Sequence, residues 1–169
     1  MKYTVVKDEY KLTGGGLYAY FPYEKFDSRN SGMIKVGYAE SFNSRADGSV
    51  HHYFPDGVYY LAFFQADGRF KPNDKTITQY LSQLEKEVFL KIVELGGQRY
   101  KASTRVRNEG ETEWFYTTPN IIKKAFKYIN EKYKGKLVLD NTVKAINEEG
   151  EKNISSSRKK YEGKYIYFL

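Results

Sequence analysis

The chain has 169 residues, a length that suits one domain with room for an additional element. Hydrophobic residues make up 40% and charged residues 29%, as in ordinary globular proteins, whereas aromatic residues reach 17%. Cysteine is absent and only two histidines are present, so disulfides, zinc–thiolate sites and histidine-rich metal sites are excluded. Any metal must be held mainly by carboxylates and water, which favours Mg²⁺ or Mn²⁺.

The charge balance favours a polyanionic partner. Lys and Arg total 28 against 21 Asp and Glu, which gives a net charge of +7. Surfaces of this sign bind phosphates and release counterions, so DNA is the expected partner and RNA is not excluded. An abundance of Lys, Asn and Tyr can also follow from an AT-rich genome, and that interpretation stays open. The basic residues form two late clusters: Lys124, Lys127, Lys132, Lys134 and Lys136, then Arg158, Lys159 and Lys160.

The sequence gives no sign of a membrane partner. Its apolar runs all fall short of the roughly 18 residues that would span a bilayer. Its start has acidic residues where a secretory leader would have an apolar stretch. We therefore expect an intracellular, cytoplasmic location, with the oligomeric state left open.

The first half of the chain predicts strands. Residues 17–21 and 33–38 are short apolar runs joined by a polar loop, which is typical of an antiparallel hairpin with a long connection. A short helix is expected over 40–45. Residues 58–64 are apolar at successive positions and predict a central strand that is buried on both faces.

The second half predicts two helices. Apolar residues recur at helical spacing over 77–95, and Gly96 follows as a stop signal. Residues 98–107 read as extended and 113–116 as a short aromatic strand or turn. A basic amphipathic helix is expected over 121–133, after Pro119.

These elements together predict an α/β fold. We expect a small, mixed, mostly antiparallel sheet of three strands, flanked by helices. The expected organisation is a core over residues 1–118, followed by a basic C-terminal helix and tail over 119–169 that docks on the core.

Five short motifs lie on these elements in a fixed order. They are Gly16-Leu17-Tyr18, Lys35-Val36-Gly37, Arg45, the helical segment Leu84-Glu85-Lys86-Glu87-Val88-Phe89, and Arg105-Val106-Arg107 followed by Glu113-Trp114-Phe115. Over residues 14–118 this order resembles the GIY-YIG nuclease superfamily, in its phage- and virus-associated branch with a Glu-Trp-Phe ending. Lys35 stands where that family usually has Tyr, Ser49 where it has His after the helix arginine, and Phe89 where the branch often has His.

The resemblance implies a divalent-metal-dependent endonuclease that hydrolyses DNA phosphodiester bonds. Tyr18 and Lys35 would handle the proton of the attacking water, as far as neighbouring charges lower their pKa values. The guanidinium fork of Arg45 suits the scissile phosphate, and Glu85 would hold Mg²⁺ or Mn²⁺. Further substrate contacts are expected from Tyr38, His51 and His52.

Other interpretations remain open. The chain could be a catalytically inactive module that binds nucleic acid with the same fold, or a viral interaction protein whose charge reflects composition. The periodicity places Glu85 at the border of the core and Glu87 further round the helix. The segment 113–115 is expected to pack the sheet against the long helix, and the basic helix over 121–133 is either a solvated face or a contact with the DNA backbone.

Overall fold

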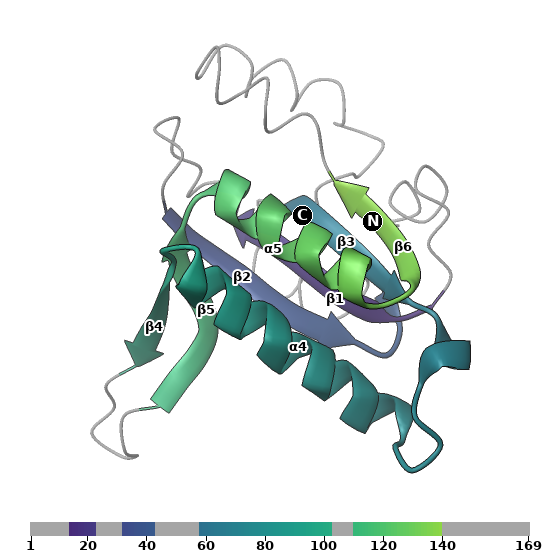
Figure 1. Cartoon of the computed structure of the whole chain (residues 1–169). Coiled ribbons are helices and arrows are strands. Elements are labelled where there is room, and N and C mark those ends of the chain that lie inside the picture. The colour runs from purple at the N-terminus through teal and green to yellow at the C-terminus, as the bar shows by residue number, and fades with distance from the viewer. Residues whose placement is uncertain (1–13, 23–31, 43–57, 103–109, 140–169) are drawn as a thin grey trace.

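The computed structural model describes residues 14–22, 32–42, 58–102 and 110–139 (Figure 1). Two long helices lie on one sheet in this part of the chain. Its elements are β1 (Gly16–Pro22), β2 (Gly32–Ala39), β3 (Val58–Ala66), the 3-10 helix η3 (Gly68–Phe70), α4 (Ile77–Glu94), β4 (Gln98–Ala102), β5 (Gly110–Thr117), α5 (Pro119–Lys132) and β6 (Gly135–Leu139).

The sheet has the strand order β4-β5-β2-β1-β3-β6, and each neighbouring pair is antiparallel. The α/β class is confirmed, but the expectation of three strands is wrong because the described ranges alone form a sheet of six. The strands β4 and β6, which complete its two ends, are each five residues long. Segments this short give little local signal, and they are strands by pairing with β5 and β3.

Both helices begin with side-chain caps. The Oγ1 of Thr76 accepts the backbone N–H of Gln79, whose side chain accepts the N–H of Thr76 in return, so α4 starts with a capping box. Thr118 caps α5, and Pro119 occupies its first turn. Gly96, with φ 107°, follows the end of α4. The two predicted helices are confirmed, with bounds within about two residues of those expected.

The helices α4 and α5 lie side by side on one face of the sheet (Figure 1). Alternation along β1 sends Leu17, Ala19 and Phe21 into the core beneath them. Tyr18 and Tyr20 consequently point to the opposite face, where their rings stack with centroids 5.7 Å apart. The aromatic layer on that face also includes Tyr60, Phe63 and Trp114.

The described part of the expected C-terminal segment, residues 119–139, packs on the same core. Ile122, Phe126 and Ile129 of α5 are buried among the core residues, and β6 extends the sheet beside β3. Where the chain divides into units stays a prediction. Neither α4 nor α5 is long and apolar enough to cross a membrane.

Candidate functional site

The second half of β2 lies along an open edge within the described sheet. β5 pairs with β2 only over Gly32–Lys35, whereas β1 pairs with β2 as far as Ala39. On this edge the backbone N–H of Tyr38 donates to Oε2 of Glu85 at 3.1 Å. Glu85 comes from α4, so a helix carboxylate replaces a ladder partner and is fixed at the edge of the sheet.

The surroundings of Glu85 disfavour the ionised form of its carboxyl group. It is partly buried, and the resulting loss of hydration, together with the nearby negative charge of Glu113, raises its pKa to about 7. The hydrogen bond from Tyr38 and the charges of Arg99 and Lys35 act in the opposite direction without cancelling the shift. A carboxyl group that titrates near neutrality is often found where a protein binds a cation or moves a proton.

Gly37 leaves space for two functional oxygens on the face opposite the helices. A Cβ at this position would lie 2.8 Å from Oη of Tyr18 and 3.4 Å from Oε2 of Glu113. Tyr18 pairs directly with Gly37 across the two strands and is only 1% exposed. The phenol and the carboxylate therefore both approach the space that a side chain at position 37 would fill.

Lys35 completes this group. It lies two residues before Gly37, so the two share a face, and its Nζ is 3.1 Å from Oε2 of Glu113. A lysine in an apolar strand is typical of an edge strand, but β2 lies between β5 and β1. Glu113 accommodates the lysine by supplying the opposite charge.

Glu113 connects the two faces of the sheet at the open edge of β2. It contacts Lys35 on the face opposite the helices, and its charge acts on Glu85, which belongs to the helix side. The strand is irregular next to Glu113. The register of β4 and β5 shifts after Arg99, and Oγ1 of Thr112 accepts the backbone N–H of Trp114.

The sequence interpretation missed this role of Glu113. It treated 113–115 as one structural segment, and this holds for Phe115, which is fully buried with its ring 5.0 Å from that of Phe89. Trp114 instead packs against Tyr20 on the other face. Glu113 is next to Trp114, the residue that pairs with Lys35. The sequence alone does not show this pairing, because it depends on the strand register.

A shallow hollow of about 520 Å³ adjoins Glu85 on the helix side. The guanidinium of Arg99 lies 4.5 Å from the centroid of the Phe89 ring and donates from Nε to the backbone oxygen of Thr112 at 2.6 Å. The other lining residues are Lys86, Leu90 and Val93. Two cations and an apolar wall thus surround the opening beside the carboxylate.

Four of the seven residues predicted to form the site are described. Tyr18 and Lys35 share the region around Gly37 with Glu113, and Glu85 is linked to that region through Glu113 and the Tyr38 backbone. The side chain of Tyr38 packs on the core, so its contribution to the site is its N–H. The remaining three, Arg45, His51 and His52, lie outside the described residues.

The carboxylates of Glu85 and Glu113 fit a divalent cation. Within the described ranges, no group of three or more His, Cys, Asp or Glu side chains gathers as a ready-made metal cage. However, the charge of Glu113 raises the cost of ionising Glu85, and a cation near both carboxylates would relieve that repulsion. One or two carboxylates completed by water or substrate oxygens are how Mg²⁺ is usually held.

Comparisons with protein-family models, with curated proteins and with solved structures gave no match for this chain. The resemblance to the GIY-YIG superfamily stays a prediction from sequence motifs. A functional proposal must therefore be supported by the geometry around Gly37 and Glu85.

Proposed function

We propose that this protein is a divalent-metal-dependent endonuclease that hydrolyses DNA phosphodiester bonds in the manner of the GIY-YIG nucleases. The observation that carries the proposal is the grouping of Tyr18, Lys35 and Glu113 around Gly37, with the perturbed carboxyl of Glu85 beside them. All four residues come from the sequence motifs, and they lie on β1, β2, β5 and α4.

Phosphodiester hydrolysis requires an activated water, charge compensation on the phosphate and help for the leaving oxygen. Glu85 and Glu113 would hold Mg²⁺ or Mn²⁺, and the ion would supply Lewis-acid stabilisation of the charge on the phosphate. Lys35 would orient Glu113 through their ion pair. Tyr18, whose hydroxyl lies over Gly37 on the same side as Oε2 of Glu113, would be the candidate base.

The test is nicking of supercoiled plasmid by the wild type and by Glu85→Gln. Loss of charge stabilisation of this kind slows an enzyme by about 10²- to 10³-fold, so nicking with Mg²⁺ should fall by that factor. The control is Glu94→Gln, which removes an exposed carboxylate from the same helix and should leave the rate unchanged. Equal nicking rates for the wild type and Glu85→Gln would refute the nuclease assignment.

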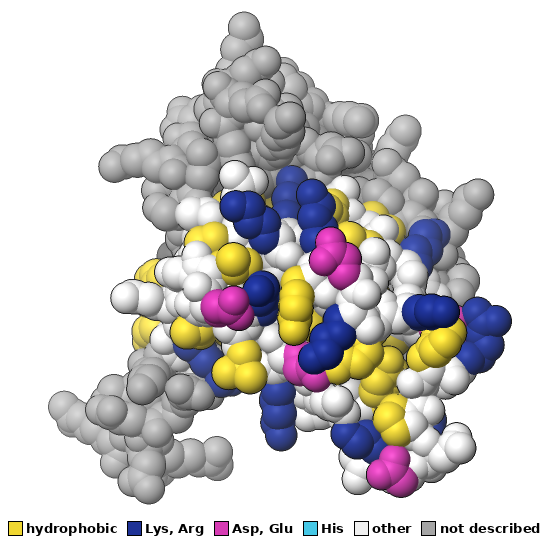
Figure 2. All heavy atoms as spheres, in the orientation of Figure 1, with side chains coloured by type: hydrophobic (Ala, Val, Ile, Leu, Met, Phe, Trp, Pro, Cys, Tyr) yellow, Lys and Arg dark blue, Asp and Glu magenta, His cyan; other side chains and the backbone are white. Residues whose placement is uncertain are grey.

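A second candidate function is nucleic-acid binding without cleavage. Figure 2 shows Lys and Arg side chains distributed over the face that α4 and α5 cover, interspersed with acidic ones. Lys124 and Lys127 of α5 are exposed there. A binding module would show salt-sensitive affinity for DNA but no cleavage with either Mg²⁺ or Mn²⁺.

A further inference from the structure

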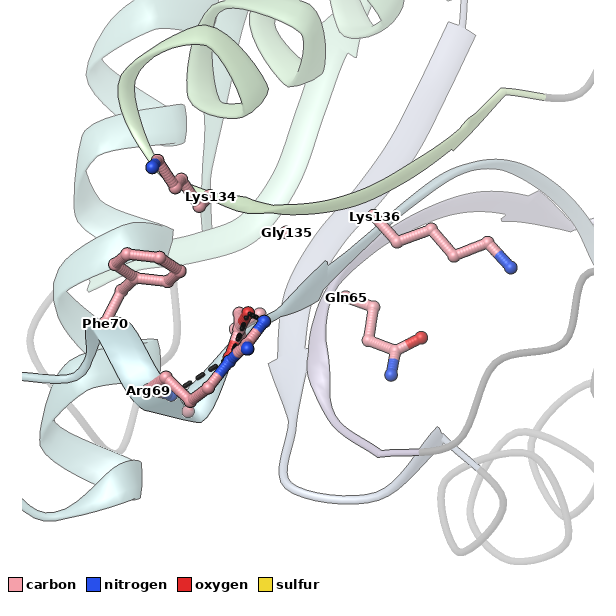
Figure 3. A pocket seen from close by; sticks show the side chains of 9 residues that line it. Gln65, Arg69, Phe70, Lys134, Gly135 and Lys136 are labelled. Carbon is pink, nitrogen blue, oxygen red and sulfur yellow. Dashed lines mark hydrogen bonds and ion pairs between the residues drawn. The ribbon is translucent and has the colours of Figure 1, made fainter.

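A basic hollow of about 760 Å³ lies between η3 and the turn from α5 to β6 (Figure 3). We call it the basic notch. It brings together residues that are more than sixty positions apart in the sequence, because β6 pairs with the end of β3. Its lining residues are Gln65, Ala66, Asp67, Gly68, Arg69, Phe70, Lys134, Gly135 and Lys136.

The guanidinium of Arg69 is held in place at the rim of the notch. Its Nε lies 3.1 Å from both carboxylate oxygens of Asp67, and its Nη2 donates to Oδ2 at 2.7 Å (Figure 3). Asp67 also accepts the backbone N–H of Arg69 and so caps η3. The Arg69 side chain is nevertheless 84% exposed, so it is oriented by Asp67 and still accessible to a ligand.

A second cation is positioned by an aromatic ring. Nζ of Lys134 lies 5.0 Å from the centroid of Phe70, within range of a cation–π contact. Phe70 is the last residue of η3 and is 45% exposed, so its ring lies at the surface beside Lys134. The ring therefore restricts the Lys134 ammonium at the opening of the notch.

The notch has the chemistry of an anion site. Three of its lining side chains are cationic, Arg69, Lys134 and Lys136, whereas Asp67 is the one acid among them. Arg and Lys suit phosphate oxygens, by a planar fork and by a point charge respectively. Asp67 pairs with part of the Arg69 guanidinium. The net positive charge of the notch therefore depends on Lys134 and Lys136 as well as on Arg69.

The notch lies at the same end of the sheet as the candidate site. A row of paired residues runs from Ala39 to Gly16, from Gly16 to Gln65 and from Gln65 to Lys136. Three strand spacings separate its ends, or about 14 Å. A nucleic-acid strand advances about 3.4 Å per nucleotide along the duplex axis, so roughly four steps cover this distance.

We propose that the basic notch binds backbone phosphates of the same nucleic-acid strand whose scissile bond lies near Glu85. This inference rests on the proposed function for its ligand and extends it by a second contact point. Arg69 and Lys134 supply the two phosphate contacts, and Phe70 fixes the position of Lys134.

The experiment measures binding of a fluorescein-labelled DNA duplex by anisotropy, in EDTA, as a function of salt. Loss of two phosphate contacts lowers the slope of log affinity against log salt by about 1.8. We expect this change for Arg69→Gln/Lys134→Gln. Between about 50 and 200 mM salt, the wild type should then lose about tenfold more affinity than the variant. The single variant Phe70→Leu should weaken binding by about threefold.

The matched control is Lys124→Gln/Lys127→Gln, which removes the same charge from exposed positions on α5. A smaller slope change for this control supports the notch, and an equal change in both double variants overturns it in favour of general charge. Melting temperatures verify that the variants fold, and Lys134→Gln alone should give about half the slope change if the double variant is unstable.

Failure of this inference is distinguishable from failure of the proposed function. Normal plasmid nicking combined with an unchanged salt slope would reject the notch alone. A reduced salt slope in a protein that never nicks DNA would reject the endonuclease and leave the notch as a nucleic-acid contact.

Discussion

Replacing Glu85 by glutamine should stabilise this protein more at pH 8 than at pH 5. Glutamine keeps the size of the side chain and an oxygen that can accept the N–H of Tyr38, so the substitution mainly removes a charge. The prediction follows from the pKa of the Glu85 carboxyl group, which burial and the charge of Glu113 raise from 4.5 to about 7.

The direction of the pH dependence follows from proton linkage. A raised pKa means that the folded state binds the Glu85 proton more tightly than the unfolded state does. The free energy of unfolding therefore falls as the pH rises from about 4.5 to about 7, and the loss is complete above that range. Glu85→Gln cannot lose a proton, so it avoids this loss.

The size of the effect is limited by solvent. A shift from 4.5 to about 7 corresponds to about 3 kcal/mol for a fully shielded group. Glu85 is only partly buried, and screening reduces this to about 1–2 kcal/mol. For a chain of this length, each kcal/mol moves the melting temperature by about 2–4 °C. The variant should therefore melt about 2–8 °C above the wild type at pH 8.

The assay is thermal unfolding followed by circular dichroism at pH 5, 6, 7 and 8 in EDTA, with the wild type, Glu85→Gln and a control variant measured in parallel. The matched control is Glu94→Gln, whose carboxylate is 68% exposed on the same helix and pairs with Lys91. Its effect on melting temperature should be the same at each pH. A gap between Glu85→Gln and wild type that stays constant from pH 5 to pH 8 would refute the electrostatic reasoning.

The remaining predictions concern the metal, the residues around Gly37 and the start of α4. At pH 8, MgCl₂ at about ten times its dissociation constant should stabilise the wild type by about 1.4 kcal/mol and Glu85→Gln much less; equal stabilisation in calorimetry would place the ion elsewhere. Lys35→Met should abolish plasmid nicking and keep DNA binding, because the ion pair with Glu113 is lost; retained nicking would remove Lys35 from the mechanism. Gly37→Ala should lower stability by about 1–3 kcal/mol, since its Cβ would lie 2.8 Å from the Tyr18 hydroxyl, and the loss should be smaller in a Tyr18→Phe background. Thr76→Ala should lower the free energy of unfolding by about 1 kcal/mol in urea titration, because the capping box is lost; no change would show that the cap contributes nothing.

The sequence predicted the long elements because their periodicity is strong and local. The apolar positions of α4 repeat over five turns, and most of them, including Leu84, Val88 and Ile92, are buried. The strand over 58–64 is confirmed as β3, and its residues 60–64 are buried as expected for a central strand. Such patterns need no knowledge of the rest of the fold.

Features that depend on strand register were beyond reach of the sequence. The partner of Lys35 is Glu113, 78 positions away, and the two meet only because β5 pairs with the first half of β2. The end strand β6 gives little sequence signal for the same reason, since Gly135–Leu139 becomes a strand by pairing with β3. β4 lies within residues 98–107, which the sequence predicted to be extended. Of the candidate site, the sequence motifs anticipated Tyr18 and Lys35. They did not show that Glu113 lies close enough to Glu85 to raise its pKa.

The contact between α4 and α5 also fixes the distance between Glu85 and the basic notch. Glu87 of α4 accepts a hydrogen bond from the Tyr133 hydroxyl and forms an ion pair with Lys132 at 3.0 Å, so the end of α5 is tied to the helix that carries Glu85. The basic notch begins one residue later, at Lys134. The fold thereby sets the separation between Glu85 and the basic notch, and under the proposed function this separation would match a fixed number of nucleotides. Oligonucleotides shorter than about five nucleotides would reach only one of them and forgo the gain from simultaneous binding, so affinity should rise in a step at that length.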